Sequence, residues 1–459
     1  MRRLRRFYDP GRFWLALCLL GLATLAGCAG SQPASPGGQA GAAAQELPTR
    51  PAGPHGEKQF LLALFRQQYL WRDELPEVDV RDYATSQELV RDLVQRASKG
   101  RDRWTRLRQR TGGQGLSLSK GGMDSGFGFN QVHRDGMVRV TEVLPGTSAH
   151  RAGVRRGDRL LHLARTPDGL DRAQPDARDL AQAAYAFGMT RPESPVPLGE
   201  PWWFRMQRAG GGEVRDLRLR KTSVQADPVP QAAEPRIIPA GPHRVGYLEL
   251  REFAPPAAAG LRRAMAQFRQ QGVTDLIVDL RYNPGGDLDT LVLLANLLCA
   301  PGADGGLMFR FHDHGHTAFQ PIWFRLQPET VQPLKLAFIV TRESGSASEA
   351  VVHALAPYYR RNLALVGQRT HGKPVGCSVF TVPGSDLELS LVVHQVENAD
   401  GCGGYFDGLP YAQFPGDTCA AEDDLDHAPG DPAEASTAAA LRWILHGSSE
   451  RGPIPPARS

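Results

Sequence analysis

Hydrophobic residues follow several different spacings along this chain, and the changes between them mark its organisation. In residues 57–71 the apolar positions recur at helical spacing, and a second helical stretch covers about residues 86–97. We expect these helices to form a small N-terminal helical cap within residues 56–115. Core packing is the expected role of their apolar side chains.

Residues 120–222 have the pattern of a β-rich module. Positions 137–143 alternate between apolar and polar residues, as in a half-buried strand, and a later strand begins at Trp202. The Pro-rich stretch 191–201 has the composition of an insertion within or after the module.

The pattern changes again after residues 225–240, which are rich in Pro and Ala and are typical of a linker. Predicted strands at 245–253, 273–281, 334–341 and 362–368 then alternate with predicted helices at 255–271, 289–298 and 348–356. Continuous apolar strands indicate a parallel sheet that is buried on both faces. We therefore expect an α/β domain over residues 236–449, in a multidomain chain whose overall class is α/β.

The N-terminus has the features of an export signal. Residues 1–27 combine an arginine-rich start with an apolar run that is short for a membrane span. The sequence Leu-Ala-Gly that precedes Cys28 resembles a bacterial lipobox, in which the cysteine is lipidated and becomes the first mature residue. An ordinary signal peptide or an uncleaved anchor are the alternatives. Residues 28–55 have the composition of a flexible tether.

The resemblance to lipoproteins implies a periplasmic protein that is attached to the membrane through a lipid. Ala29, where inner-membrane lipoproteins have Asp, implies sorting to the outer membrane of a Gram-negative bacterium. The formal net charge of the chain is +4, and residues 1–27, with five Arg and one Asp, account for all of it. We therefore expect no nucleic-acid partner.

Four of the six cysteines lie beyond residue 28: Cys299, Cys377, Cys402 and Cys419. Cys402 and Cys419 flank a Gly/Pro-rich segment, and we expect them to form a disulfide, because an oxidising compartment permits one. A zinc site is the alternative, but no C-x-x-C or H-x-x-x-H spacing accompanies these cysteines. We expect neither a metal nor a cofactor.

Three short segments of the α/β domain carry candidate chemistry. Residues 281–286 read Arg-Tyr-Asn-Pro-Gly-Gly, residues 344–349 read Ser-Gly-Ser-Ala-Ser-Glu, and residues 370–373 read Thr-His-Gly-Lys. A serine between a strand and a helix is exposed, and the helix N-terminus favours developing negative charge. The same position suits a helix cap, for which Ser348 is the better candidate.

Together and in this order, the three segments resemble the carboxyl-terminal processing peptidases, or tail-specific proteases. The resemblance implies a ClpP- or crotonase-like core in which Ser346 is the nucleophile and Lys373 is the general base. It also implies an oxyanion hole formed by the N–H groups of Ala347 and Gly286, with Gly285 as the alternative to the latter. Glu349 and Thr370 match positions that support the dyad.

The chain departs from the family pattern at two points. Ser346 and Lys373 are 27 positions apart, two more than the family pattern. Cys377 stands four residues after the lysine, where the family often has a Gln that orients it. A lysine can act as a base only where its surroundings favour the neutral amine, which arginine does not provide.

The β-rich module resembles a PDZ domain. Its signature starts with Gly126, Phe127, Gly128 and Phe129 and continues with PGTSAHRAGVRRGD at residues 145–158. Such a loop leaves backbone N–H groups that can bind a terminal carboxylate, while the following strand pairs with an extended peptide. A β-hairpin turn without a ligand is the alternative.

Other chemistries fit less well. His312, His314 and His316 could bind a metal, but no carboxylate–histidine helix pattern accompanies them, and no G-x-S-x-G motif surrounds Ser346. The expected function is a serine endopeptidase that cleaves envelope proteins or peptides with accessible C-termini. A catalytically weak binding protein, like the retinoid-binding relatives of these peptidases, and a scaffold that uses only its PDZ-like module are the alternatives.

Overall fold

The structure is a computed structural model, and it describes residues 49, 52–110, 123–172, 196–230, 235–313, 320–447 and 452–455. The predicted signal peptide, Cys28 and nearly all of the predicted tether lie outside these residues. In the part of the chain that is described, no helix is both long and apolar enough to cross a membrane.

A six-stranded sheet lies at the centre of the α/β domain. In spatial order its strands are β18 (Asp417–Ala420), β15 (Leu363–Gly367), β14 (Leu336–Val340), β11 (Asp275–Asp279), β10 (His243–Glu249) and β9 (Arg236–Ala240). All neighbours pair in parallel except β9, which is antiparallel to β10. Strands β11, β14 and β15 are buried at every position, as expected for parallel strands with both faces covered.

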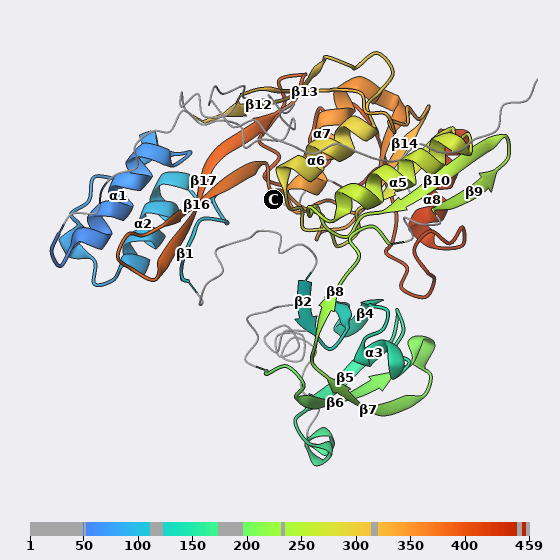
Figure 1. Ribbon diagram of the computed structural model, residues 1–459, viewed down its shortest axis with the longest axis horizontal. Coiled ribbons are helices and arrows are strands. Elements are labelled where there is room, and N and C mark those ends of the chain that lie inside the picture. Colours follow the sequence, from blue (N-terminus) through green and yellow to red (C-terminus); the bar gives the residue numbers. More distant parts are fainter. Residues whose placement is uncertain are drawn as a thin grey trace, which may run out of the picture. The chain divides into compact units, whose positions relative to one another are not determined.

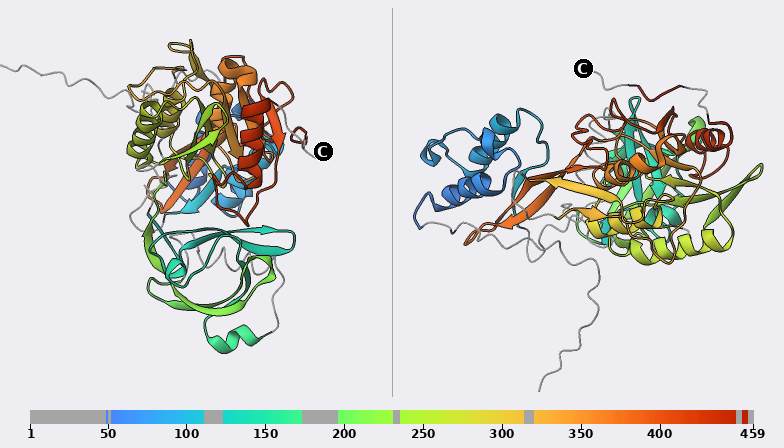
Figure 2. Two further views of the ribbon diagram at one scale, coloured as in Figure 1. Left: turned by 90° about the vertical axis from the view of Figure 1, so that its right-hand side faces the viewer. Right: turned by 90° about the horizontal axis from the view of Figure 1, so that it is seen from above.

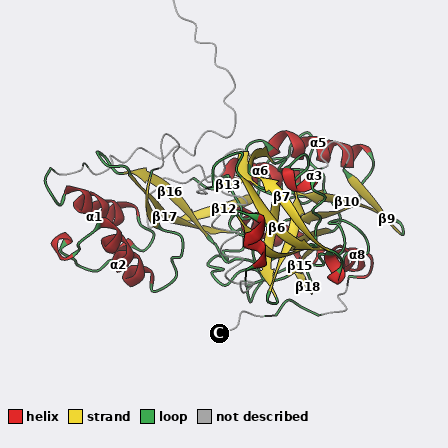
Figure 3. Ribbon diagram, turned by 90° about the horizontal axis from the view of Figure 1, so that it is seen from below, coloured by secondary structure: helices red, strands yellow, loops and turns green. Residues whose placement is uncertain are grey.

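Helices cover both faces of this sheet (Figures 1 and 3). They are α5 (Ala257–Gln270), α6 (Leu288–Leu297), α7 (Ala347–Tyr359) and α8 (Ala435–His446). Successive residues of β11 enter two different hydrophobic cores. Leu276 packs in the core that contains α5, α6 and α7, whereas Ile277 packs in the core that contains Trp443 of α8.

A second sheet connects the α/β domain to the N-terminal helices. Its strands are β1 (Arg106–Gln109), β17 (Leu387–Glu397), β12 (Leu307–His312) and β13 (Ile322–Trp323), with β16 (Val375–Thr381) also paired to β17. Helices α1 (Gly56–Gln68) and α2 (Ser86–Ser98) share a hydrophobic core with β16 and β17. The N-terminal segment therefore contributes a strand as well as helices.

The β-rich module has its own hydrophobic core. It contains β2 (Met123–Gly126), β3 (Phe129–Arg134), β4 (Met137–Val143), α3 (Ser148–Arg151), β5 (Arg159–Ala164), β6 (Pro201–Gln207), β7 (Val214–Arg220) and β8 (Thr222–Gln225). Strands β3 to β7 form an antiparallel sheet in chain order, which curves as Figure 2 shows, and β2 pairs with β8. Phe127, Phe129 and Phe204 pack at the centre of its core.

Five short 3₁₀ helices complete the described elements: η1 (Arg72–Glu74), η2 (Val80–Asp82), η3 (Pro167–Asp171), η4 (Ala209–Gly211) and η5 (Arg360–Asn362).

Two sequence-based expectations are wrong. The stretch 225–240 is not a linker throughout, because its last five residues form β9, in which buried Ile238 pairs with Val245. Pro239 is tolerated there because β9 lies at the sheet edge. The expected disulfide is also missing, since Cys402 and Cys419 keep separate thiols among the described residues. Cys419 is buried in β18, whereas Cys402 lies in the turn after β17, where its N–H donates to Asn398.

Candidate active site

Ser346 occupies a strained turn between β14 and α7. It is the residue that caps α7, and its backbone has φ 54° and ψ −114°, a conformation that side chains disfavour. A serine held in such a strand–turn–helix arrangement directs its hydroxyl away from the sheet, at the end of the helix where the dipole favours negative charge. The geometry is suited to a nucleophile.

The two neighbouring serines have structural partners instead. The Ser344 hydroxyl donates to the Leu280 carbonyl at 2.7 Å, and the Ser348 hydroxyl donates to the Asn283 carbonyl at 2.9 Å. Both side chains are fully buried. Ser348 is therefore not the helix cap that its position suggests, because α7 already begins at Ala347.

The buried carboxylate of Glu349 joins two turns. One oxygen, Oε2, accepts the N–H of Ser346 at 2.9 Å and the N–H of Lys373 at 2.8 Å. The other oxygen accepts the Thr370 hydroxyl at 2.5 Å and the Gly372 N–H at 2.6 Å. Burial raises the pKa of Glu349, and these hydrogen bonds act in the opposite direction. The backbones of Ser346 and Lys373 thus meet at a single oxygen atom.

The turn that carries Lys373 lies between β15 and β16 and is fixed from several sides. The Thr370 hydroxyl accepts the N–H of Leu409 at 2.7 Å. Arg103 donates to the carbonyls of Gly372 and Phe406, at 3.1 and 2.7 Å. Gly372 has φ +85°, and a Cβ there would overlap the Phe406 carbonyl oxygen, so only glycine fits.

Lys373 itself is half-buried, and no ion pair of its amine with a carboxylate is seen in the described part of the chain. The charge of Lys373 affects the pKa values of two neighbouring residues, His371 and Cys377. Burial lowers the pKa of His371, and the positive charges of Arg103 and Lys373 lower it further. Burial raises the pKa of Cys377, and Lys373 opposes that shift. Cys377 follows a β-bulge in β16, on the strand that leaves the lysine turn.

Two backbone N–H groups near Ser346 have no acceptor among the described residues, those of Ala347 and Gly286. The N–H of Gly285 is instead taken by the Asn283 side chain at 2.9 Å. A Cβ on Gly285, which has φ +102°, would lie 2.7 Å from both the Ala347 nitrogen and the Ser346 Cβ. The turn that contains Gly285 and Gly286 therefore packs directly against the turn that carries Ser346.

Asn283 is a residue whose role sequence reasoning missed. Its buried side chain donates to the Leu250 carbonyl, and its own carbonyl accepts the Gly345 N–H and the Ser348 hydroxyl. It ties the glycine turn to the serine turn. The motif in residues 281–286 contained this asparagine, but a backbone-organising role leaves no signal of its own in the sequence.

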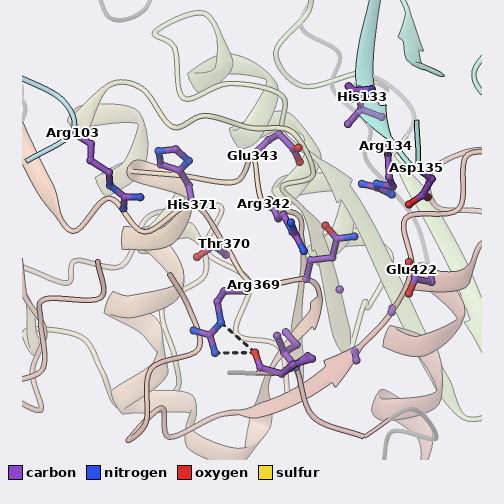
Figure 4. A pocket seen from close by; sticks show the side chains of 17 residues that line it. Arg103, His133, Arg134, Asp135, Arg342, Glu343, Arg369, Thr370, His371 and Glu422 are labelled. Carbon is purple, nitrogen blue, oxygen red and sulfur yellow. Dashed lines mark hydrogen bonds between the residues drawn. The ribbon is translucent and has the colours of Figure 1, made fainter. Parts of the chain in front are cut away.

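A cavity of about 1010 Å³ lies beside these turns, at the carboxyl ends of β14, β15 and β18 (Figure 4). Thr370, His371 and Arg342 line one part of it, and the β3–β4 turn of the β-rich module lines another. Neither Ser346 nor Lys373 is among its lining residues. The cavity therefore adjoins the serine and lysine turns through Thr370 and His371.

The predicted tail-binding loop lies between β2 and β3. The Phe127 and Phe129 rings pack on Phe204, with centroids 4.8 and 5.9 Å away. Gly128 has φ +98°, and a Cβ there would overlap Thr147. In the described residues, the N–H groups of Phe127 and Gly128 have no acceptor. The Phe127 and Phe129 side chains thus pack in the core of the β-rich module. The N–H groups of Phe127 and Gly128 remain without an acceptor among the described residues.

The histidine-rich segment contributes no cluster to the described structure. His312 pairs with Glu397 at 2.5 Å, and His314 and His316 lie outside the described residues. Within the described ranges, no group of three or more His, Cys, Asp or Glu side chains could hold a metal ion.

Two segments of the chain match protein-family models. Residues 244–404 match the model of peptidase family S41, and residues 56–106 match the model of the S41 N-terminal domain. The chain is similar to peptidase family S41 over these two segments. These two matches cover the N-terminal helices and most of the α/β domain, including all the residues of the two turns. This likeness to family S41 supports a serine peptidase function.

Individual relatives agree with this family. A carboxyl-terminal-processing protease of Picosynechococcus sp. is 27% identical over 299 residues, which are 64% of this chain and 65% of the relative. The protease CtpA of Bacillus subtilis is 22% identical over 249 residues, 54% of this chain and 47% of the relative. The chain thus matches less than two thirds of the length of either relative.

A solved structure shares the fold. It comes from Bacteroides fragilis and is provisionally assigned as an S41 protease, with a TM-score of 0.63 at 21% identity. The superposition covers 87% of this chain and 99% of the other. At this identity the likeness concerns the mixed α/β multidomain fold alone.

Proposed function

We propose that this chain is a serine endopeptidase with a catalytic dyad of Ser346 and Lys373. The observation that carries the proposal is the Glu349 carboxylate, one oxygen of which accepts the N–H groups of both residues. This shared oxygen joins the turn of a strained serine to the turn of a lysine for which no ion-paired carboxylate is seen among the described residues.

The reaction follows from these groups. The neutral Lys373 amine accepts the proton of the Ser346 hydroxyl as its oxygen attacks the scissile carbonyl carbon. The resulting ammonium returns the proton to the nitrogen of the leaving amine when the peptide bond breaks, which leaves an acyl-enzyme ester. Water then attacks the ester, and Lys373 takes a proton from that water and returns it to the serine oxygen.

The N–H groups of Ala347 and Gly286 form the oxyanion hole in this proposal. Ala347 follows Ser346, and Gly286 follows Gly285, which packs against Ser346. Neither N–H is used by the described residues, so both are available when the carbonyl oxygen becomes negative. Glu349 and Thr370 keep the two turns in register. Such prior positioning matters because donors that are already aligned need no reorganisation during the reaction.

We further propose that the substrates are envelope proteins or peptides with accessible C-termini. The β-rich module acts as a PDZ-like domain in this account, and the leftover N–H groups of Phe127 and Gly128 bind the terminal carboxylate. Lipidation of Cys28 attaches the protein to the outer membrane from the periplasmic side. The motif that precedes Cys28 supports this part of the proposal.

A fluorophosphonate probe tests the proposal, because it labels only activated serines. We expect the wild-type chain to be labelled, peptide mapping to place the label on Ser346, and Ser346→Ala to remove it. Ser344→Ala is the matched control and should keep the label if the variant folds. A wild-type chain that hydrolyses no protein and takes no label would instead support a binding protein or a scaffold.

A further inference from the structure

Ile454 and Pro455, at the end of the described segment 452–455, line the cavity next to the turn that carries Lys373. The Gly452 carbonyl accepts the N–H of Ala420 in β18 at 3.0 Å, so the segment runs beside the edge strand of the six-stranded sheet. Ile454 is only 5% exposed and packs in the main hydrophobic core, and it lines the cavity together with Pro455. This segment is therefore anchored by its backbone and by a buried side chain.

Arg369 links this segment to the rest of the site. Its Nε and Nη2 atoms donate to the Pro455 carbonyl at 3.2 and 3.0 Å (Figure 4). Its Nη1 atom donates to the carbonyls of Gly408 and Pro410 at 3.2 and 2.7 Å. The planar guanidinium has N–H groups in a fixed fork, so it holds three carbonyls from two separate segments in one geometry.

The same fork is directly connected to the catalytic segment. Thr370, the next residue, is bonded both to Leu409 and to Glu349. Gly372 then packs against Phe406 and donates to Glu349, and Lys373 follows. From Arg369 to Lys373 the backbone thus rests on the 405–410 loop on one side and on Glu349 on the other. Through its hydrogen bonds to Pro455, Arg369 connects residues 452–455 to this series of contacts.

We propose that Arg369 and residues 452–455 form a strap that positions the turn carrying Lys373 relative to Ser346. The strap touches no reacting atom, so Arg369 is a positioning residue. This inference rests on the proposed function, since it concerns the geometry of the proposed dyad. A loosened turn would leave Lys373 attached but less often in place to take the serine proton, and displacements of about 1 Å can cost roughly 100-fold in rate.

The test measures the rate at which the fluorophosphonate probe labels Ser346, from pH 6 to pH 10, below the melting temperature of each variant. The variants are Arg369→Gln, Arg369→Lys and a chain that ends at Gly447. Arg361→Gln is the matched control, because Arg361 lies at the other end of β15 and its side chain is 89% exposed.

We expect Arg369→Gln and the shortened chain to be labelled about tenfold more slowly or worse, with the pH dependence displaced. Arg369→Lys should be intermediate, because it keeps the charge but loses the fork, and Arg361→Gln should match the wild type. In peptide hydrolysis, Arg369→Gln should lower kcat more than it raises KM.

If folded Arg369→Gln and the shortened chain are labelled at the wild-type rate, the proposed positioning role of the strap is refuted. This holds even if both variants melt at lower temperature, because the strap would then have a structural role only. Faster labelling in the shortened chain would also overturn it, since the segment would then obstruct the site. Failure of the proposed function gives different results: a wild type that takes no label, or labelling of the wild type that survives in Ser346→Ala.

Discussion

Ser346 is stabilised in a backbone conformation that suits few residues other than glycine, and its neighbours explain how this is possible. Its N–H is bonded to Glu349, and the Gly345 N–H is bonded to the Asn283 carbonyl. Gly285 lies directly against the serine because it has no side chain. At this scale the candidate site depends on close backbone contacts as much as on the two side chains of the proposed dyad.

Gly285→Ala should therefore disable the site. The new Cβ would lie 2.7 Å from the Ser346 Cβ and the Ala347 nitrogen, and φ is +102°. We expect at least tenfold slower fluorophosphonate labelling and a loss of stability on the order of 1–3 kcal/mol. Gly272→Ala is the control, because Gly272 also has positive φ, at +65°, but no atom within 4 Å of its Cβ position. Equal labelling of both variants would refute the close-contact account.

The helices and strands of the α/β domain are easier to predict from the sequence than the pairing of strands with one another. The helix predicted at 255–271 is α5 (Ala257–Gln270), and the strand predicted at 273–281 is β11 (Asp275–Asp279). These elements are predictable because apolar periodicity and burial agree locally. Strand β1, in contrast, is set by pairing with β17 about 280 residues later, which no local pattern reveals.

The residues of the candidate site likewise include some that short motifs predict and others that no local pattern reveals. Short motifs predict Ser346, Lys373, Ala347 and Gly286 as site residues, and backbone contacts in the structure join the segments that carry them. Arg103, which clamps the lysine turn from the N-terminal segment, was not found, because it contacts only backbone carbonyls. Contacts of a side chain with a distant backbone carry no sequence pattern.

Strand β10 ends in a carboxyl group whose titration should be measurable. Burial raises the pKa of Glu249 from 4.5 to about 7; Arg251 opposes this shift, and Glu142 of β4 adds to it. Between these pH values the folded chain holds more protons than the unfolded chain, so this group makes the free energy of unfolding fall as pH rises from about 4.5 through 7.

Glu249→Gln should remove this dependence. Denaturant unfolding at pH 4, 6 and 8 should show the variant gaining on the wild type as pH rises, by on the order of 1–3 kcal/mol at pH 8. At pH 4 the two should differ least, because the wild-type carboxyl is then mostly neutral in the folded chain. A difference between the two that stays constant with pH would contradict the assignment.

At the scale of the whole molecule, the proposed tail capture joins the β-rich module to the chemistry of the α/β domain. Amidating the C-terminus of a model peptide should raise KM by the equivalent of about 1–3 kcal/mol, because buried donors lose a charged acceptor. Gly128→Ala, in which the Cβ would overlap Thr147, should abolish the discrimination, whereas Gly136→Ala, with open space around its Cβ, should keep it. Equal cleavage of free and amidated peptides by the wild type would refute tail capture.

The proposed lipid anchor is a second feature of the whole molecule. Cys28→Ala should release the protein from the membrane fraction, because a single acylated cysteine is the attachment that the N-terminal motif predicts. Cys18→Ala, in the apolar run of the predicted signal peptide, is the matched control and should remain with the membranes. Unchanged fractionation of Cys28→Ala, followed by immunoblotting, would show that the attachment lies elsewhere.

The dyad is the centre of this account, and Lys373→Arg tests it most directly. Arginine keeps the positive charge and much of the length, but it does not supply a neutral amine near neutral pH. The measurement is the rate of hydrolysis of an unstructured protein such as casein at pH 8, with circular dichroism to confirm folding. We predict a folded variant whose rate falls to that of Ser346→Ala. Substantial hydrolysis by Lys373→Arg would contradict the account and would make His371, which packs against Gly345, the candidate base.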